Sequence, residues 1–246
     1  MQTIRPGPAR ERKHRGSPCA SCGPMPDFTD VVLVQHVTPA ASRARVAPAR
    51  CPGAVPVPVS EADCVPTTFL NGIACLFGRG EIPPLVIQRV YTYTLNGVSR
   101  SNTLGDGTDE WGIRVTSEWL GAYKEGQFAV KTEYLRGTEV HVKRGNQLVG
   151  CLNTGGVGLC NLHIGGNIWH YVLAIKADPE GLSFFDPYFQ RTVKGLNGCV
   201  QRLHDDPDGA NLWVERDWLD TYSNRKRYCF GSVRNREAVL LWRRKR

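Results

Sequence analysis

Three residues have the side chains needed for thiol-based chemistry: Cys64, His170 and Asp186. A thiolate can attack a carbonyl carbon, an imidazole can hold and return the proton, and a carboxylate can orient the imidazole. Taken singly, a cysteine in a helix, a histidine in a strand and an Asp-Pro turn are ordinary structural features. Together they predict a nucleophilic site, provided that the intervening elements bring them to one place.

The sequence predicts that Cys64 lies at the start of a helix. Asp63 is a good N-cap residue, and Pro66 still falls in the first turn, where a missing N–H costs nothing. Apolar residues then recur every three or four positions until Gly78, at Phe69, Leu70, Ile73, Ala74, Leu76 and Phe77. A helix over 63–78 would point its unpaired N–H groups and positive dipole end at the thiol, which favours the thiolate.

His170 and Asp186 are predicted to meet across a hairpin. Residues 169–175 are dense in β-branched and aromatic side chains, 178–181 form a turn, and 182–185 return as a second strand. We expect Asp186 to accept a hydrogen bond from Nδ1 of His170, so that Nε2 faces the thiol. Three other histidines compete for the role of base, but His163 lacks a partnering hairpin and His204 resembles a surface-loop residue; His141 is the third.

The remaining pattern predicts an α+β fold in which helices precede strands and lie on one side of an antiparallel sheet. The third helix, from Thr108 or Asp109 to about Tyr123, should turn Trp111, Val115, Trp119 and Leu120 inward. The other expected helices are 84–95 and 138–143, and the other expected strands are 127–135, 157–163, 212–215, 227–231 and 238–242.

Composition divides the chain into a basic tail rich in Pro, Arg and Ala over residues 1–55, expected to be disordered, and a folded domain over 56–246. The net charge is +8, yet residues 56–242 hold 19 basic and 20 acidic side chains, so the basicity belongs to the chain ends. Nucleic-acid binding is therefore not expected, and the aromatic and basic residues of 213–228 are interpreted as a solvated edge.

The nine cysteines and the lack of a secretory or membrane-spanning segment predict a reduced, cytoplasmic protein with buried thiols, including Cys75. The pair Cys19 and Cys22 is a single pair, whereas a zinc site needs four ligands, so no metal is expected. No organic cofactor is implied either.

Three motifs resemble those of the papain-like cysteine peptidases: Asp-Cys-Val-Pro-Thr at 63–67, His-Tyr-Val-Leu at 170–173 and Phe-Asp-Pro-Tyr at 185–188. Within that group the chain is most similar, over about 57–190, to the peptidase domains of bacteriocin-processing transporters and their stand-alone relatives. The resemblance implies a papain-like fold, a peptide or protein substrate, and cleavage of leader peptides, often after a double glycine. It makes Cys64 the nucleophile, His170 the general base and acid, and Asp186 the orienting residue. No transmembrane or ATPase segment follows, so a transporter is not expected.

Two positions depart from the family pattern, and one of them is Val65, where many relatives have a Gly directly after the cysteine. Relatives usually carry a Gln six residues before the cysteine that helps to bind the oxyanion, and Pro58 stands there, leaving Ser60 or the Cys64 N–H as substitutes. Loss of one oxyanion donor costs roughly 10²–10³ in rate. Two alternatives to peptide hydrolysis therefore remain: a weak or inactive peptide-binding module, and acyl transfer to an amine by the same triad.

Overall fold

The computed structural model describes residues 64–97, 107–143, 145–166, 168–187, 198–223 and 226–245. The predictions for the basic tail, for Asp63 as an N-cap and for Pro58 and Ser60 lie outside these residues. Within the described part of the chain, no helix is long and apolar enough to cross a membrane.

Three helices lie where the sequence predicts them: α1 (Cys64–Leu76), α2 (Pro84–Thr94) and α3 (Glu110–Ala122). Asp109 caps α3, since its side chain accepts a hydrogen bond from the Gly112 N–H at 2.8 Å. The predicted inner face of α3 is only partly right, because Ile113, Thr116 and Leu120 are buried whereas Trp111 is 54% exposed.

The strands form one eight-stranded sheet in the order β1-β2-β8-β3-β4-β5-β7-β6, and every neighbouring pair is antiparallel. Their bounds are Lys124–Glu125 (β1), Phe128–Arg136 (β2), Val157–Gly165 (β3), Ile168–Ala177 (β4), Gly181–Phe185 (β5), Val200–Arg202 (β6), Leu212–Glu215 (β7) and Glu237–Arg243 (β8). Helices combined with an antiparallel sheet confirm the α+β class. The expected strand at 227–231 is wrong, because only an isolated bridge between His163 and Cys229 occurs there.

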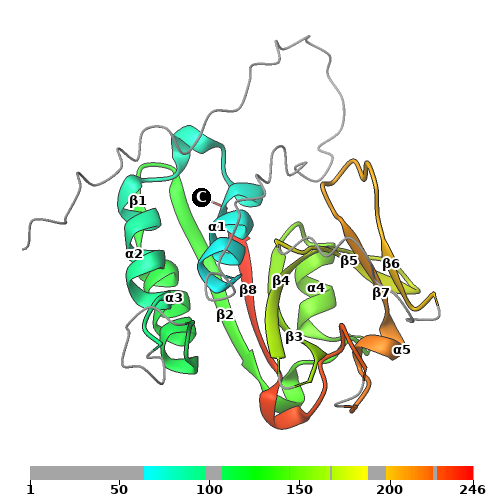
Figure 1. Cartoon of the computed structure of the whole chain (residues 1–246). Helices are drawn as coiled ribbons and strands as arrows, with labels where there is room; N and C mark the ends of the chain where they lie inside the picture. Colours follow the sequence, from blue (N-terminus) through cyan, green and yellow to red (C-terminus); the bar gives the residue numbers. More distant parts are fainter. Residues whose placement is uncertain are drawn as a thin grey trace, which may run out of the picture. The chain divides into compact units, whose positions relative to one another are not determined.

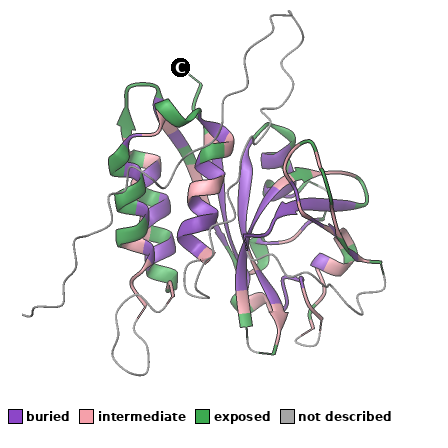
Figure 2. Cartoon of the chain, turned by 45° about the horizontal axis from the view of Figure 1, so that its top comes forward, coloured by how far each residue is buried: buried purple, intermediate pink, exposed green. Residues whose placement is uncertain are grey.

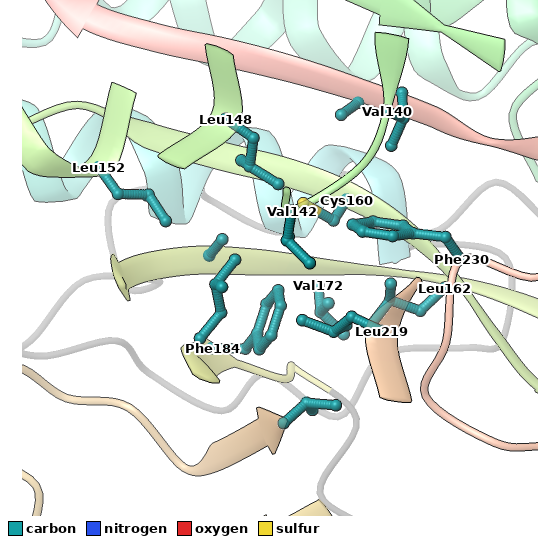
Figure 3. Close-up of a cluster of buried hydrophobic side chains, with 14 of the residues drawn as sticks. Val140, Val142, Leu148, Leu152, Cys160, Leu162, Val172, Phe184, Leu219 and Phe230 are labelled. Atoms are coloured by element: carbon teal, nitrogen blue, oxygen red, sulfur yellow. The ribbon is translucent and has the colours of Figure 1, made fainter. Parts of the chain in front are cut away.

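Helices cover both faces of the sheet, whereas the sequence predicted one (Figure 1). Side chains alternate along β4, so Tyr171 and Leu173 join the core under α1–α3, while Val172 and Ala174 join a second core. That second core packs against α4 (Gln147–Asn153) and the short α5 (Arg216–Leu219) (Figures 2 and 3). The expected helix over 138–143 is also wrong: a single 3₁₀ turn spans Gly137–Glu139, and α4 begins at Gln147.

The prediction that the cysteines are buried, reduced thiols is confirmed only in part. Cys151, Cys160 and Cys229 are free and buried. Cys75, on α1, is disulfide-bonded, so the prediction of a reduced thiol at that position is wrong.

Candidate active site

Cys64 is the first residue of α1, and its side chain is half-buried. The neighbouring turn is fixed by Thr68, whose fully buried hydroxyl lies 2.6 Å from the carbonyl oxygen of Cys64 and 3.1 Å from that of Tyr171. Because Tyr171 follows His170 on β4, this hydroxyl ties the start of the helix to the strand that carries the imidazole. The first N–H groups of α1 have no partner within the helix, so they favour negative charge near the thiol.

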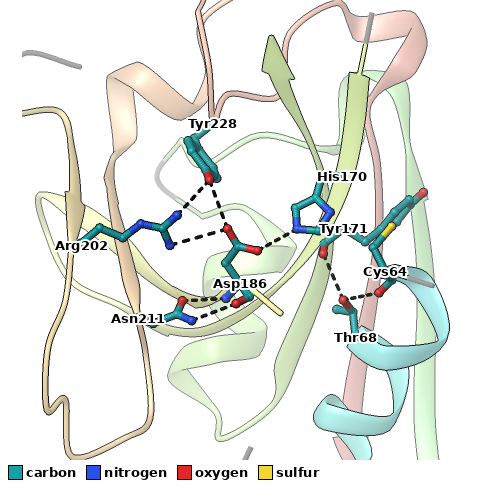
Figure 4. A network of polar contacts seen from close by, with 8 residues as sticks. All are labelled: Cys64, Thr68, His170, Tyr171, Asp186, Arg202, Asn211 and Tyr228. Carbon is teal, nitrogen blue, oxygen red and sulfur yellow. Dashed lines mark hydrogen bonds and ion pairs between the residues drawn. The ribbon is translucent and has the colours of Figure 1, made fainter. Parts of the chain in front are cut away.

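His170 and Asp186 meet as the hairpin predicts, with Nε2 of His170 2.7 Å from Oδ1 of Asp186. Both residues are buried, with exposed fractions of 7% and 1%. The predicted ring orientation is wrong: Nε2, not Nδ1, faces the carboxylate. Figure 4 shows the other ring nitrogen on the side where Cys64 lies. The ring therefore stands between the thiol and the carboxylate.

Burial lowers the pKa of His170, but hydrogen bonds to Asp186 and to Cys64, together with the charges of those groups, outweigh it and raise the pKa to about 9. The imidazole therefore carries a proton at neutral pH. An imidazolium beside a thiol at a helix N-terminus stabilises the thiolate, which is the nucleophilic form.

Three residues that the sequence analysis did not identify hold Asp186 in place (Figure 4). The side chain of Asn211 accepts from the Asp186 N–H at 2.8 Å and donates to the Asp186 carbonyl at 2.9 Å. The Tyr228 hydroxyl donates to Oδ2 at 3.2 Å, and the Arg202 guanidinium lies 3.7 Å from the same oxygen. Arg202 and Tyr228 thus act on one oxygen of the carboxylate, which leaves the other for His170.

No local sequence pattern predicts that these three residues contact Asp186. They lie between 16 and 42 positions after Asp186 in the sequence, on β6, just before β7 and in the segment that precedes β8. Of the three, Tyr228 has an unusual backbone conformation: its φ is 56°, in the left-handed region that is uncommon for an aromatic residue. This backbone belongs to the segment that presents the hydroxyl to Asp186.

The competing histidines do not join this group. His163 is 1% exposed, and its Nδ1 and Nε2 lie 2.7 Å and 2.9 Å from the carbonyl oxygens of Lys226 and Gly166. Nδ1 of His141 accepts from the Lys143 N–H, and His204 is exposed. Because both ring nitrogens of His163 are engaged by backbone, that residue serves the structure of the 226–229 segment.

No group of three or more His, Cys, Asp or Glu side chains within the described ranges has the arrangement of a metal site. Comparison of the sequence with models of known families finds no match, and comparison with curated proteins finds none.

Proposed function

We propose that this protein is a papain-like cysteine peptidase, with Cys64 as nucleophile, His170 as general acid and base, and Asp186 as the residue that orients His170. The observation that carries the proposal is the position of the His170 ring. Its Nε2 hydrogen-bonds to Asp186, and the ring lies between that carboxylate and Cys64, the first residue of a helix. A buried histidine paired in this way has the charge and orientation that a thiol peptidase requires.

In the first half of the reaction, the Cys64 thiolate attacks the carbonyl carbon of the scissile peptide bond. The carbonyl oxygen becomes an oxyanion, which the unpaired N–H groups at the start of α1 can stabilise. His170 then gives its proton to the leaving amine nitrogen as the C–N bond breaks. The products of this step are a free amine and a thioester between Cys64 and the acyl part of the substrate.

In the second half, His170 is neutral and accepts a proton from water as the water oxygen attacks the thioester carbon. The C–S bond breaks, a carboxylic acid leaves, and Cys64 and His170 return to the thiolate–imidazolium pair. Asp186 takes no proton in either half. Its role is to keep Nε2 hydrogen-bonded, so that Nδ1 stays directed toward the sulfur and the substrate.

The proposed substrate is a peptide or the leader segment of a protein, with cleavage after glycine as the specific expectation, and we propose a cytoplasmic location. The resemblance of residues 63–67, 170–173 and 185–188 to the bacteriocin-processing peptidases supports this narrower assignment. An amine added to the reaction tests for acyl transfer, since a thioester that reacts with the amine yields a product of different mass.

The test is hydrolysis of a mixture of peptides, some containing a Gly-Gly bond, followed by mass spectrometry. We expect cleavage by the wild type, no cleavage by Cys64→Ala, and wild-type cleavage by Cys199→Ser, which removes a different free thiol that is also only half-buried. Equal cleavage by the wild type and by Cys64→Ala would refute the proposal. So would labelling of Cys64 by iodoacetamide no faster than that of Cys199.

A further inference from the structure

A cavity of about 290 Å³ lies on the α1–α3 face of the sheet. The lining residues that matter here are Glu110, Arg136, Asn161, Trp169, Arg234 and Glu237. The volume suits a single side chain, and the mechanism described above uses none of these residues.

The pairing of the strands places several lining residues of this cavity in one row with Tyr171. Arg136 pairs with Glu237 across β2 and β8, and Asn161 pairs with Tyr171 across β3 and β4. Since Cys160 pairs with Ala238, Asn161 and Glu237 are also opposite each other. These four side chains therefore form one row on one face of the sheet.

Tyr171 ends this row next to the active site. It follows His170, and its carbonyl oxygen contacts Thr68 of α1. The hydroxyl of Tyr171 donates to Oε2 of Glu237. The charge of Cys64 contributes to raising the pKa of this Tyr171 hydroxyl. Figure 4 shows the Tyr171 ring on the Cys64 side of His170, away from Asp186. Tyr171 thus connects the Glu237 carboxylate of the cavity to the segment that carries His170.

The floor of the cavity has more acceptors than donors. Glu237 is 8% exposed, and each carboxylate oxygen accepts one hydroxyl, from Tyr171 and from Tyr134. No Lys, Arg or His of the described part of the chain lies within ion-pair distance of it. The buried Oδ1 of Asn161 has no hydrogen-bond partner among the described residues.

The nearby cations are already paired or exposed. Arg136 forms an ion pair with Glu110. Arg234 is exposed at the rim, where solvent screens its charge, whereas Glu237 and the Asn161 oxygen are buried. A buried carboxylate that lacks a cation and a buried carbonyl oxygen that lacks a donor both gain most from a ligand that supplies positively charged N–H groups.

We propose that this cavity is a specificity pocket that binds a lysine or arginine side chain of the peptide substrate, with Glu237 and Asn161 as its recognition residues. The inference rests on the proposed peptidase function and adds the substrate feature that the site selects. The ammonium or guanidinium group donates to Glu237 and to Oδ1 of Asn161, and its aliphatic stem lies along Trp169. The indole and the exposed Arg234 flank the entrance.

The test uses short peptidyl chloromethyl ketones that alkylate Cys64, with glycine next to the reactive group. The second and third positions are varied in turn among lysine, arginine, norleucine and glutamate. Norleucine has the stem of lysine without the charge, so the ratio of the lysine rate to the norleucine rate measures recognition of the ammonium group. A ratio taken within one variant cancels any general effect on the thiol.

We expect the wild type to prefer lysine or arginine over norleucine by about tenfold or more at one position, since hydrogen bonds to charged groups are strong. Glu237→Gln and Asn161→Leu should each reduce the ratio to less than about threefold, whereas Glu118→Gln, on the exposed surface of α3, should leave it unchanged. Thermal unfolding verifies that each variant is folded, and Asn161→Leu keeps the test valid should Glu237→Gln not fold.

The outcomes separate the two proposals. Alkylation of Cys64 at equal rates by the lysine and norleucine probes, or fastest by the glutamate probe, overturns the pocket assignment and leaves the peptidase proposal standing. A lysine preference that persists in both pocket variants also overturns it. If no probe labels Cys64 faster than Cys199, the peptidase proposal fails, and the pocket assignment fails with it.

Discussion

Replacing Asp186 with asparagine removes the negative charge beside His170 while keeping the size of the side chain. The pKa of His170 is about 9, against 6.5 for an unperturbed histidine, and this difference corresponds to roughly 3 kcal/mol in favour of the imidazolium. This value is a net effect, because burial by itself lowers the pKa of His170. Asp186 raises that pKa both through its hydrogen bond and through its charge. Its loss should therefore lower the pKa of His170 by at least about one unit, which corresponds to about a tenfold change in the thiolate–imidazolium population.

The measurement is the rate of Cys64 alkylation by iodoacetamide as a function of pH, with the modified residue identified by mass spectrometry. The wild type should react at a nearly constant rate from about pH 6 to pH 8, because His170, with a pKa of about 9, stays protonated beside the sulfur over this interval. Asp186→Asn should react at least about tenfold more slowly at pH 6, and its rate should rise with pH as that of an ordinary thiol does. The control is Asp208→Asn, which removes a carboxylate from a partly exposed ion pair with Lys176.

Two results would contradict the reasoning about Asp186. A rate for Asp186→Asn within twofold of the wild type at pH 6 would mean that the carboxylate does not maintain the charge of His170. An equal loss in Asp208→Asn would mean that the effect is general and has no connection with the site. Because Arg202 and Tyr228 also contact the carboxylate, thermal unfolding must verify that the variant is folded before its rate is interpreted.

Three further predictions concern stability. Thr68→Val should lower the free energy of unfolding by about 1–3 kcal/mol, measured by urea denaturation, because the hydroxyl contacts two carbonyl oxygens in a buried place. Gly181→Ala should destabilise by about 1–3 kcal/mol in the same assay, because its Cβ would collide with the Trp213 ring; an unchanged midpoint would contradict this. The folded-state pKa of His170 lies above its unfolded value, so its contribution to stability is complete below pH 6.5 and is lost as pH rises through about 9. His170→Gln should therefore lack a decline of up to about 3 kcal/mol that the wild type shows over this interval.

Periodicity predicted the elements that carry the site, because each is defined by local pattern. The apolar spacing after Cys64 gave α1, and the β-branched run from Trp169 gave β4. The position of β8 was not predictable in this way. Its residues were expected to form a strand, but its place between β2 and β3 depends on pairings over roughly 80 to 110 positions, which no local signal encodes. The helix α4 was not predicted, because the Gly-rich sequence that follows Leu148 obscures a helical period.

Within the site, the pairing of His170 with Asp186 was predicted correctly, but the predicted orientation of the ring, with Nδ1 on the carboxylate, was wrong. Spacing along a hairpin indicated that His170 and Asp186 meet, yet either ring nitrogen satisfies the spacing. The structure has Nε2 on the carboxylate. Trp111 shows the same limit: helical period assigned it to the inner face, whereas the residues one and two positions later, Gly112 and Ile113, are buried instead. A period predicts a face only to within about a third of a turn.

The pairing of the hairpin strands explains why the site forms where it does. β4 pairs with β3 from Ile168 onward, but its first pair with β5 is between Leu173 and Phe185. Among the described residues, no strand pairs with β4 before Leu173 on the β5 side. Asp186 is the first residue after β5; its carboxylate bonds to His170, and the Asn211 side chain holds its backbone through two hydrogen bonds. The His170–Asp186 pair thus forms where β5 ends, and Thr68 ties the start of α1, with Cys64, to the residue of β4 that follows His170.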